Sequence, residues 1–234
     1  MKSKVLMVLI VAIGMAIAAE GQSLSVGPRV GASFTTFRAL GGNDSYRESF
    51  NDEYDYAIGA QFGAVFNFSV SKIVSIQPEI LYSQKGYETH QPSVAGDPTG
   101  DISSKLRMNY LEVPVMARIS FGGENFKSFV TAGPSAGYWM NGKSWFSFAG
   151  REEEKSYEFQ DRYVDSMKDN RLDISANVGV GVAYNVGAGA LNLDIRYGFG
   201  LSGISKYEND RPSDEPKVGH RTFGVSLAYL FLVK

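Results

Sequence analysis

The sequence predicts an all-β fold, an eight-stranded antiparallel up-and-down transmembrane β-barrel. Three observations favour this fold. Apolar residues alternate with period two along eight segments, which places them on one face of a strand and which a helix does not produce. The other face of these segments is mostly small and polar instead of charged, which suits a narrow barrel interior better than a solvated surface. Short and long connections alternate between the segments, as they do in barrels of the bacterial outer membrane.

The composition excludes several other classes of protein. The chain has 234 residues, of which 44% are hydrophobic and 21% charged, with a formal net charge of −2 and no cysteine. It cannot supply the repeated apolar runs of about 20 residues that a bundle of membrane helices needs. A net charge so close to zero argues against nucleic acid as a partner. Without cysteine the chain forms no disulfide, thiol nucleophile or cysteine metal site.

The first residues are typical of a secretory signal peptide. Lys2 and Lys4 precede an apolar run from Val5 to Ala19, which is too short to span a bilayer comfortably. Small residues suited to cleavage follow this run. We expect residues 1–21 to be a signal peptide and residues 22–234 to form the barrel domain. An uncleaved N-terminal anchor is the alternative.

Each expected strand rests on its own alternation. In the second strand the even positions from Tyr56 to Phe68 are all apolar, and the sixth strand shows the same regularity. The eight strands are expected at 24–37, 55–69, 73–87, 106–120, 128–140, 171–186, 190–201 and 221–233. They exceed the roughly 5–6 residues usual in soluble sheets and suffice for the about 9–11 residues that a tilted strand needs to cross a bilayer. A soluble lipocalin-like barrel is disfavoured because its charged outer face is missing.

The connections between the strands predict the orientation of the barrel. The short turns are expected near 69–72, 121–127 and 187–189, and the long polar loops near 38–54, 88–105, 141–170 and 202–220. Outer-membrane barrels have short periplasmic turns and long extracellular loops. Because the number of strands is even, both ends of the mature chain are expected on the periplasmic side of the bacterial outer membrane. We expect a monomer surrounded by outer-membrane lipid.

Seven charged residues fall on the inward-facing positions of the strands. They are Arg29, Glu79, Glu112, Arg118, Asp173, Asp194 and Arg196. An eight-stranded barrel is filled by its own side chains, and charges buried there must pair with one another. We therefore expect a structural charge network and a closed, non-conducting lumen. A proton or ion pathway is the alternative.

Four prolines, Pro28, Pro78, Pro114 and Pro134, fall within expected strands. Proline cannot donate a hydrogen bond to a neighbouring strand and is usually confined to edges or bulges, whereas a closed barrel has no edge. We expect local β-bulges at these four positions. A bulge there would shift the inward-facing positions by one residue.

The chain contains little that points to catalysis. Its two histidines, His90 and His220, are expected in or beside the long loops, and no nucleophile motif frames them, although Ser93 and Glu88 lie near His90. No ligand spacing typical of a metal site is found. We expect no catalytic residue, metal or cofactor. A small lipid-modifying enzyme built around His90 or His220 is the least favoured alternative.

The longest loop is rich in aromatic residues. Loop 141–170 contains Trp145, Phe146, Phe148, Tyr157, Phe159 and Tyr163 among many charges. Solvated linkers rarely hold so many aromatic residues, and exposed aromatic side chains often mark contact surfaces. We expect this loop to extend its β-hairpin above the membrane and to contact an extracellular protein or glycan.

Several segments resemble the PorT-like outer-membrane β-barrel family of Bacteroidetes-type bacteria. The segments are VSIQPEILYSQKGYE at 74–88, NYLEVPVMARI at 109–119, LDIRYGFGLSGIS at 193–205, VGPRVGASFTTF at 26–37, VTAGPSAGYWM at 130–140, GVGVAYNVG at 179–187 and FGVSLAYLF at 223–231. The resemblance implies an eight-stranded barrel without established catalysis. One member of the family is linked to secretion across the envelope, so a secretion or assembly accessory with a secretion-machinery partner is an alternative function. The chain departs from the family pattern in loop 141–170, which is longer and more charged.

Overall fold

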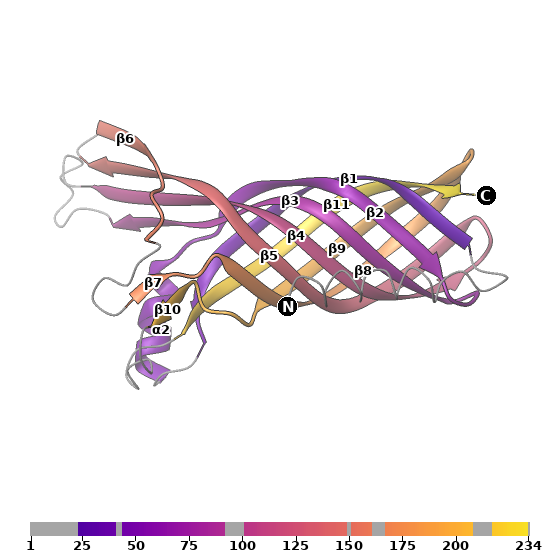
Figure 1. Ribbon diagram of the computed structural model, residues 1–234, viewed down its shortest axis with the longest axis horizontal. Coiled ribbons are helices and arrows are strands. Elements are labelled where there is room, and N and C mark those ends of the chain that lie inside the picture. Colours follow the sequence, from indigo (N-terminus) through magenta and orange to yellow (C-terminus); the bar gives the residue numbers. More distant parts are fainter. Residues whose placement is uncertain are drawn as a thin grey trace, which may run out of the picture.

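The computed structural model describes residues 23–40, 44–91, 101–148, 151–160, 167–207 and 217–233. Eight long strands dominate it: β1 (Ser23–Ala39), β2 (Ala57–Ser69), β3 (Val74–Gln91), β4 (Ile102–Gly122), β5 (Phe126–Phe148), β8 (Leu172–Val186), β9 (Gly189–Gly200) and β11 (Val218–Val233). Neighbouring strands are antiparallel in the order β4-β3-β2-β1-β11-β9-β8-β5, and the pairing of β4 with β5 closes the ring (Figure 1). The predicted eight-stranded up-and-down barrel is confirmed.

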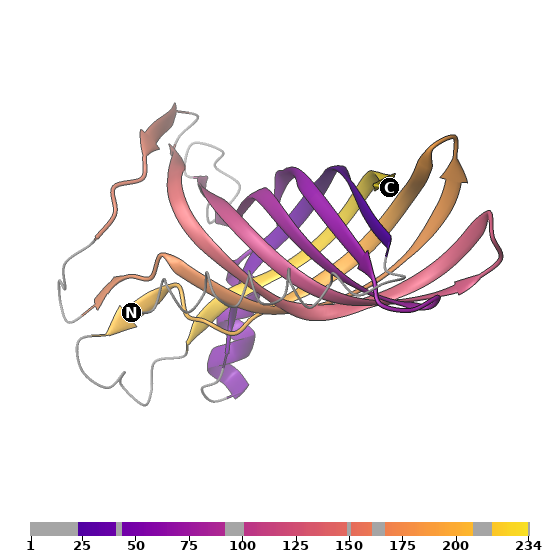
Figure 2. The same ribbon diagram turned by 45° about the vertical axis from the view of Figure 1, so that its right-hand side comes forward.

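The two ends of the barrel differ. At the turn end, short connections join β2 to β3, β4 to β5 and β8 to β9, and the first and last described residues, Ser23 and Val233, lie there too. At the loop end lie the smaller elements, α2 (Asp44–Glu53), β6 (Arg151–Ser156), β7 (Met167–Asp169) and β10 (Ser205–Tyr207). Figures 1 and 2 show β3, β4 and β5 rising past the barrel rim at this end, where β6 extends the sheet. The predicted signal peptide, 1–21, lies outside the described residues.

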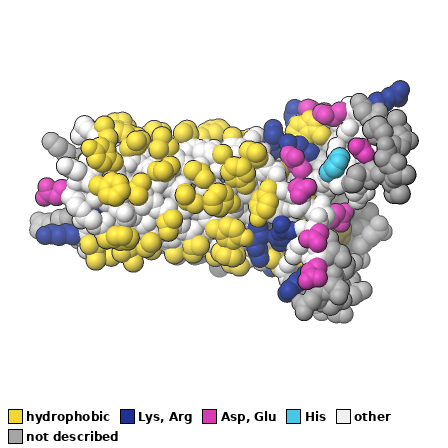
Figure 3. Space-filling model, turned by 180° about the vertical axis from the view of Figure 1, so that it is seen from behind, with side chains coloured by type: hydrophobic (Ala, Val, Ile, Leu, Met, Phe, Trp, Pro, Cys, Tyr) yellow, Lys and Arg dark blue, Asp and Glu magenta, His cyan; other side chains and the backbone are white. Residues whose placement is uncertain are grey.

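Alternation along the strands separates an apolar outer face from a polar interior. On the outer face Val30, Ile58 and Val180 are each more than half exposed, at 57%, 60% and 55%. Figure 3 shows hydrophobic side chains spread over the visible wall of the barrel, with charged residues gathered at its two ends. A closed ring pairs every strand with two neighbours, so the backbone needs no hydrogen bonds from the surrounding lipid. No helix among the described residues is long and apolar enough to cross a membrane.

The prediction of bulges at the four prolines is wrong. Around Pro28, for example, Val26 pairs with Phe231 and Arg29 with Ala228, so the register is the same on both sides. The registers past Pro78, Pro114 and Pro134 are equally unchanged. At each of the four prolines the ladder to one neighbour is interrupted without being shifted, because the missing N–H removes one bond while the flanking pairs hold the strand in place.

A β-bulge is present between β4 and β5, at a position that contains no proline. Tyr110 pairs with Trp139 and Asn109 with Asn141, so Met140 is an additional residue in β5. One additional residue reverses the alternation of the strand beyond it. Trp145 therefore continues the outer face of the barrel, whereas Phe146 lies on the side that continues the lumen.

Candidate functional site

All charges that the sequence assigns to the lumen lie inside the barrel. Six are buried, Arg29, Glu79, Glu112, Arg118, Asp173 and Asp194, and the side chain of Arg196 is 11% exposed. The sequence analysis missed Lys85, which is 5% exposed and lies on the inward face of β3 with Glu79. Positions 79 and 85 are both odd and therefore lie on the same face of the strand, and this could have identified Lys85 as inward-facing. With Lys85 included, four cations face four carboxylates in the described lumen.

The first of two charge layers joins β1, β3 and β9. The Arg29 guanidinium contacts Glu79 Oε1 at 2.9 Å and Asp194 Oδ1 at 2.5 Å. Arg196 reaches the same Glu79 oxygen at 3.0 Å, and Gln77 Nε2 donates a third hydrogen bond to it at 2.6 Å. Two buried cations thus face two buried anions, an arrangement that compensates the cost of removing these groups from water. We call this set of Arg29, Glu79, Asp194 and Arg196 the central layer.

The second layer lies nearer the loop end and joins β3, β4 and β8. Lys85 Nζ lies 2.5 Å from Glu112 Oε1 and 2.7 Å from Asp173 Oδ2. Ser202 donates a hydrogen bond to the second oxygen of Asp173 at 3.0 Å. We call Lys85, Glu112 and Asp173 the upper layer. One cation here holds two carboxylates, so its loss would leave both without a counter-charge.

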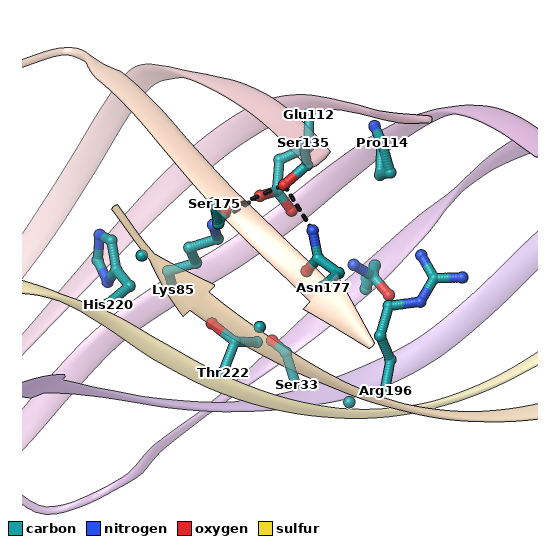
Figure 4. A pocket seen from close by; sticks show the side chains of 14 residues that line it. Ser33, Lys85, Glu112, Pro114, Ser135, Ser175, Asn177, Arg196, His220 and Thr222 are labelled. Carbon is teal, nitrogen blue, oxygen red and sulfur yellow. Dashed lines mark hydrogen bonds and ion pairs between the residues drawn. The ribbon is translucent and has the colours of Figure 1, made fainter. Parts of the chain in front are cut away.

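A small polar cavity of about 40 Å³ separates the two layers. Figure 4 shows Lys85 and His220 on one side of it and Arg196 on the other. Ser135 lies 3.0 Å from Ser175 and accepts a hydrogen bond from Asn177 at 3.0 Å. A water needs about 10–15 Å³ of such space, so the cavity holds a few waters at most.

Arg118 closes the lumen toward the turn end. Its guanidinium lies 3.7 Å from the centre of the Phe129 ring and donates hydrogen bonds to Asn192 at 2.9 Å and to Gln77 at 3.3 Å. A wider vestibule of about 440 Å³, in whose wall Arg118 and Asn192 both lie, opens beyond it at the turn end. The lumen is therefore open to water at the turn end and narrows abruptly at Arg118.

A cluster of mostly aromatic side chains, which we call the aromatic cluster, closes the loop end of the lumen. Its buried members are Phe37, Leu106, Met108, Tyr110 and Trp139. Tyr157 and Phe159, which the sequence assigns to a contact surface, pack inward, each with its ring centre 4.7 Å from that of Trp139. Burial and the nearby Asp169 carboxylate raise the pKa of Tyr157 above its ordinary value. These two aromatic side chains pack on Trp139 at the barrel mouth.

The other predicted contact residues belong to a sheet above the rim. The loop-end sheet consists of the outer parts of β3, β4 and β5 together with β6. Phe146 and Phe148 are each 50% exposed on its inner side, and Trp145, on its outer side, donates a hydrogen bond to Glu154 at 2.9 Å. Hydrogen bonding from Lys143 lowers the pKa of the exposed Glu154. Tyr163 lies outside the described residues.

The family model for an outer membrane protein beta-barrel domain matches residues 19–206. The chain belongs to this family. It is therefore an outer-membrane β-barrel protein of bacteria. No protein of curated function matches the sequence.

Solved structures of other outer-membrane barrels are similar to this chain. Ail, the attachment invasion locus protein of Yersinia pestis, is 14% identical, with 91% of this chain and 100% of Ail covered and a TM-score of 0.36. Neisserial surface protein A is 14% identical, with 91% and 99% covered and a TM-score of 0.42. The outer membrane protease OmpT of Escherichia coli is 7% identical, with 92% and 98% covered and a TM-score of 0.44.

The two histidines of this outer-membrane barrel lie apart. His220 was expected in or beside a loop, but it lies within β11, is 2% exposed and faces the Tyr110 hydroxyl at 3.2 Å inside the lumen. His90 is exposed near the end of β3, opposite Ser103 on β4. Ser93 lies outside the described residues. The described part of the chain contains no cluster of three or more histidine and carboxylate side chains that could hold a metal ion.

Proposed function

We propose that this outer-membrane barrel is a non-conducting anchor that presents its loop-end sheet to a partner outside the cell. The proposal rests mainly on the filled lumen. Between the turn-end vestibule and the barrel mouth lie Arg118, the central layer, the upper layer and the aromatic cluster. Paired buried charges resist displacement because each unpaired partner would be left without compensation. A continuous path for hydrated ions would have to cross all of them.

The proposed orientation places the loop end outside the cell and both ends of the mature chain in the periplasm. It is supported by the short connections at the end that also holds Ser23 and Val233, since outer-membrane barrels have short turns on the periplasmic side. Removal of residues 1–21 as a signal peptide and a monomeric state belong to the same proposal.

The surface offered to the partner is the inner side of the loop-end sheet. Half-exposed aromatic residues such as Phe146 and Phe148 are common anchors of interfaces. The edge strand β6 has the sequence REEEKS, and charged edge strands resist unspecific pairing with other strands. The partner is therefore expected to bind the aromatic side chains of β5 instead of adding a strand to the sheet. We propose an extracellular protein as the partner, and a glycan is the other outcome of the test.

Site-specific photo-crosslinking on intact cells tests this proposal. A photoreactive amino acid at Phe148, on the loop-end sheet, is expected to yield adducts with an extracellular partner. The same group at Ile73, which is 58% exposed in a turn at the opposite end, is expected to yield none. A Phe146→Ser/Phe148→Ser variant should fold normally, because both side chains are half exposed, but should no longer bind the captured partner. The absence of adducts at Phe148 would contradict the proposal, and adducts that only glycosidase removes would identify a glycan.

The alternative, a PorT-type accessory of secretion or envelope assembly, rests on the resemblance of the strands. The most specific segments of that resemblance contain Gln77, Glu79 and Glu112, and these side chains belong to the charge network of the lumen. The resemblance therefore has an explanation in barrel packing alone. Adducts with envelope proteins at Ile73, and none at Phe148, would favour the accessory function. An enzymatic role for His90 or His220 has no supporting arrangement of side chains among the described residues.

A further inference from the structure

Four arginines at the loop end each lie over an aromatic ring. The guanidinium carbon is 5.9 Å from the ring centre for Arg38 and Tyr56, 5.4 Å for Arg107 and Trp145, 4.9 Å for Arg171 and Tyr138, and 5.5 Å for Arg221 and Phe199. We call Arg38, Arg107, Arg171 and Arg221 the arginine collar. Its members come from different parts of the chain, so only the closed barrel brings them together at its loop end.

The collar lies where the apolar band ends, and Arg171 lies both over the outward-facing Tyr138 and, at 4.0 Å, over Phe159 of the barrel mouth. Tyr56, Tyr138 and Phe199 are 44%, 48% and 40% exposed, as expected for rings on the lipid-facing side. Arg221 precedes the outward-facing Phe223 by two positions and pairs with Phe199 across the β9–β11 ladder. Figure 3 shows Lys and Arg side chains where the hydrophobic band meets the loop end.

The collar charges are held in place without being neutralised. Arg38 donates a hydrogen bond to the carbonyl of Asn51, Arg171 to those of Trp139 and Met140, and Arg221 to those of Gly200 and His220. Carbonyl groups fix the direction of a guanidinium but carry no net charge. Within the part of the chain that the structure describes, none of the four forms an ion pair with a carboxylate.

Two lysines of the loop-end sheet, in contrast to the collar arginines, pair with carboxylates. Lys105 pairs with Glu88, and Lys143 pairs with Glu154, both within the same loop-end sheet. The collar arginines thus keep four positive charges in the zone where the hydrocarbon of a membrane gives way to headgroups. Guanidinium groups bind phosphate oxygens through paired hydrogen bonds, and aromatic rings prefer the same interfacial zone.

We infer that the arginine collar binds the phosphate groups of anionic lipids in the membrane leaflet at the loop end. The apolar band beneath the collar accommodates the acyl chains, and the guanidinium groups stand at the height of the headgroups. This binding is independent of the partner proposed for the loop-end sheet. It gives the barrel a preference for phosphate-rich lipid at one of its two ends.

Native mass spectrometry of the purified protein in a neutral maltoside detergent tests this inference. Dioleoyl phosphatidic acid and dioleoyl phosphatidylcholine serve as probes of equal chain length. The wild type is expected to bind phosphatidic acid at least about tenfold more tightly than phosphatidylcholine. A single charge-assisted hydrogen bond raises a binding constant by about this factor. An Arg38→Gln/Arg107→Gln/Arg171→Gln/Arg221→Gln variant should lose this preference. A control variant, Lys72→Gln/Lys127→Gln, removes two charges at the turn end and should keep it.

A second variant keeps the inference testable if the fourfold change disturbs folding. Arg107→Gln/Arg221→Gln leaves the carbonyl contacts of Arg38 and Arg171 intact and should lower the preference several-fold. A heat-shifted gel band reports whether each variant is folded. Equal binding of the two lipids by the wild type would overturn the inference, as would an unchanged preference in the folded collar variants or an equal loss in the turn-end control.

Discussion

Replacement of Glu79 by glutamine is expected to destabilise the barrel by about 3–5 kcal/mol. Glu79 is fully buried, and one of its oxygens contacts Arg29, Arg196 and Gln77. Glutamine has nearly the same volume but no charge, so two buried guanidinium groups would be left with Asp194 as their carboxylate partner in the central layer. The free energy of unfolding, measured by urea titration of the barrel in detergent or lipid, gives the loss directly.

Glu154→Gln is the matched control for this change. Glu154 also contacts a cation, Lys143, but it is exposed on the loop-end sheet, where water screens the ion pair and its loss changes stability little. The two variants make the same chemical change in different surroundings. Similar losses for Glu79→Gln and Glu154→Gln would show that the central layer does not stabilise the closed barrel.

Replacement of Lys85 by methionine is the second change with a large expected effect. It removes the one cation of the upper layer and leaves Glu112 and Asp173, at 2.5 and 2.7 Å from its nitrogen, without their counter-charge. We expect a loss of about 3–5 kcal/mol in the free energy of unfolding. Lys105→Met is the control, because its partner Glu88 is partly exposed and water can replace the lost charge.

A triple variant separates charge from packing in the upper layer. Lys85→Met/Glu112→Gln/Asp173→Asn removes the cation together with both anions, so no buried charge is left unpaired. Neutral replacements of whole buried ion groups are often tolerated, and most of the loss should therefore be recovered. If the triple variant is as unstable as Lys85→Met alone, the loss comes from packing and not from uncompensated charge.

The sequence predicts the barrel well because its main signal is local. Lipid on one side and a narrow lumen on the other impose period two on every strand, so the positions of Ile58 or Val180 already reveal their face. Whether a residue has an odd or an even position along its strand likewise shows which charged side chains face the lumen. This rule would have identified Lys85 as well. The inward position of His220 was missed because its strand begins at Val218, before the alternation becomes regular.

Other features depend on contacts that no local pattern contains. Loop 141–170 is aromatic throughout, but only the packing of Tyr157 and Phe159 on Trp139 separates the residues that close the barrel mouth from those that stay exposed. The bulge at Met140 likewise reverses the faces of β5 without a sequence signal. At the prolines, flanking pairs hold the register more firmly than the missing hydrogen bond disturbs it. The arginine collar arises only when distant strands close into one ring.

Conductance of the wild-type protein in a planar lipid bilayer tests the central claim, a lumen closed by its own side chains, most directly. Folded protein, identified by its heat-shifted gel band, is inserted at neutral pH, and a porin added afterwards to the same bilayer verifies that open channels are detected. We expect no stable current steps before the porin is added, because Arg118, the two charge layers and the aromatic cluster fill the lumen. Reproducible ion-selective steps from the wild type alone would contradict a closed lumen.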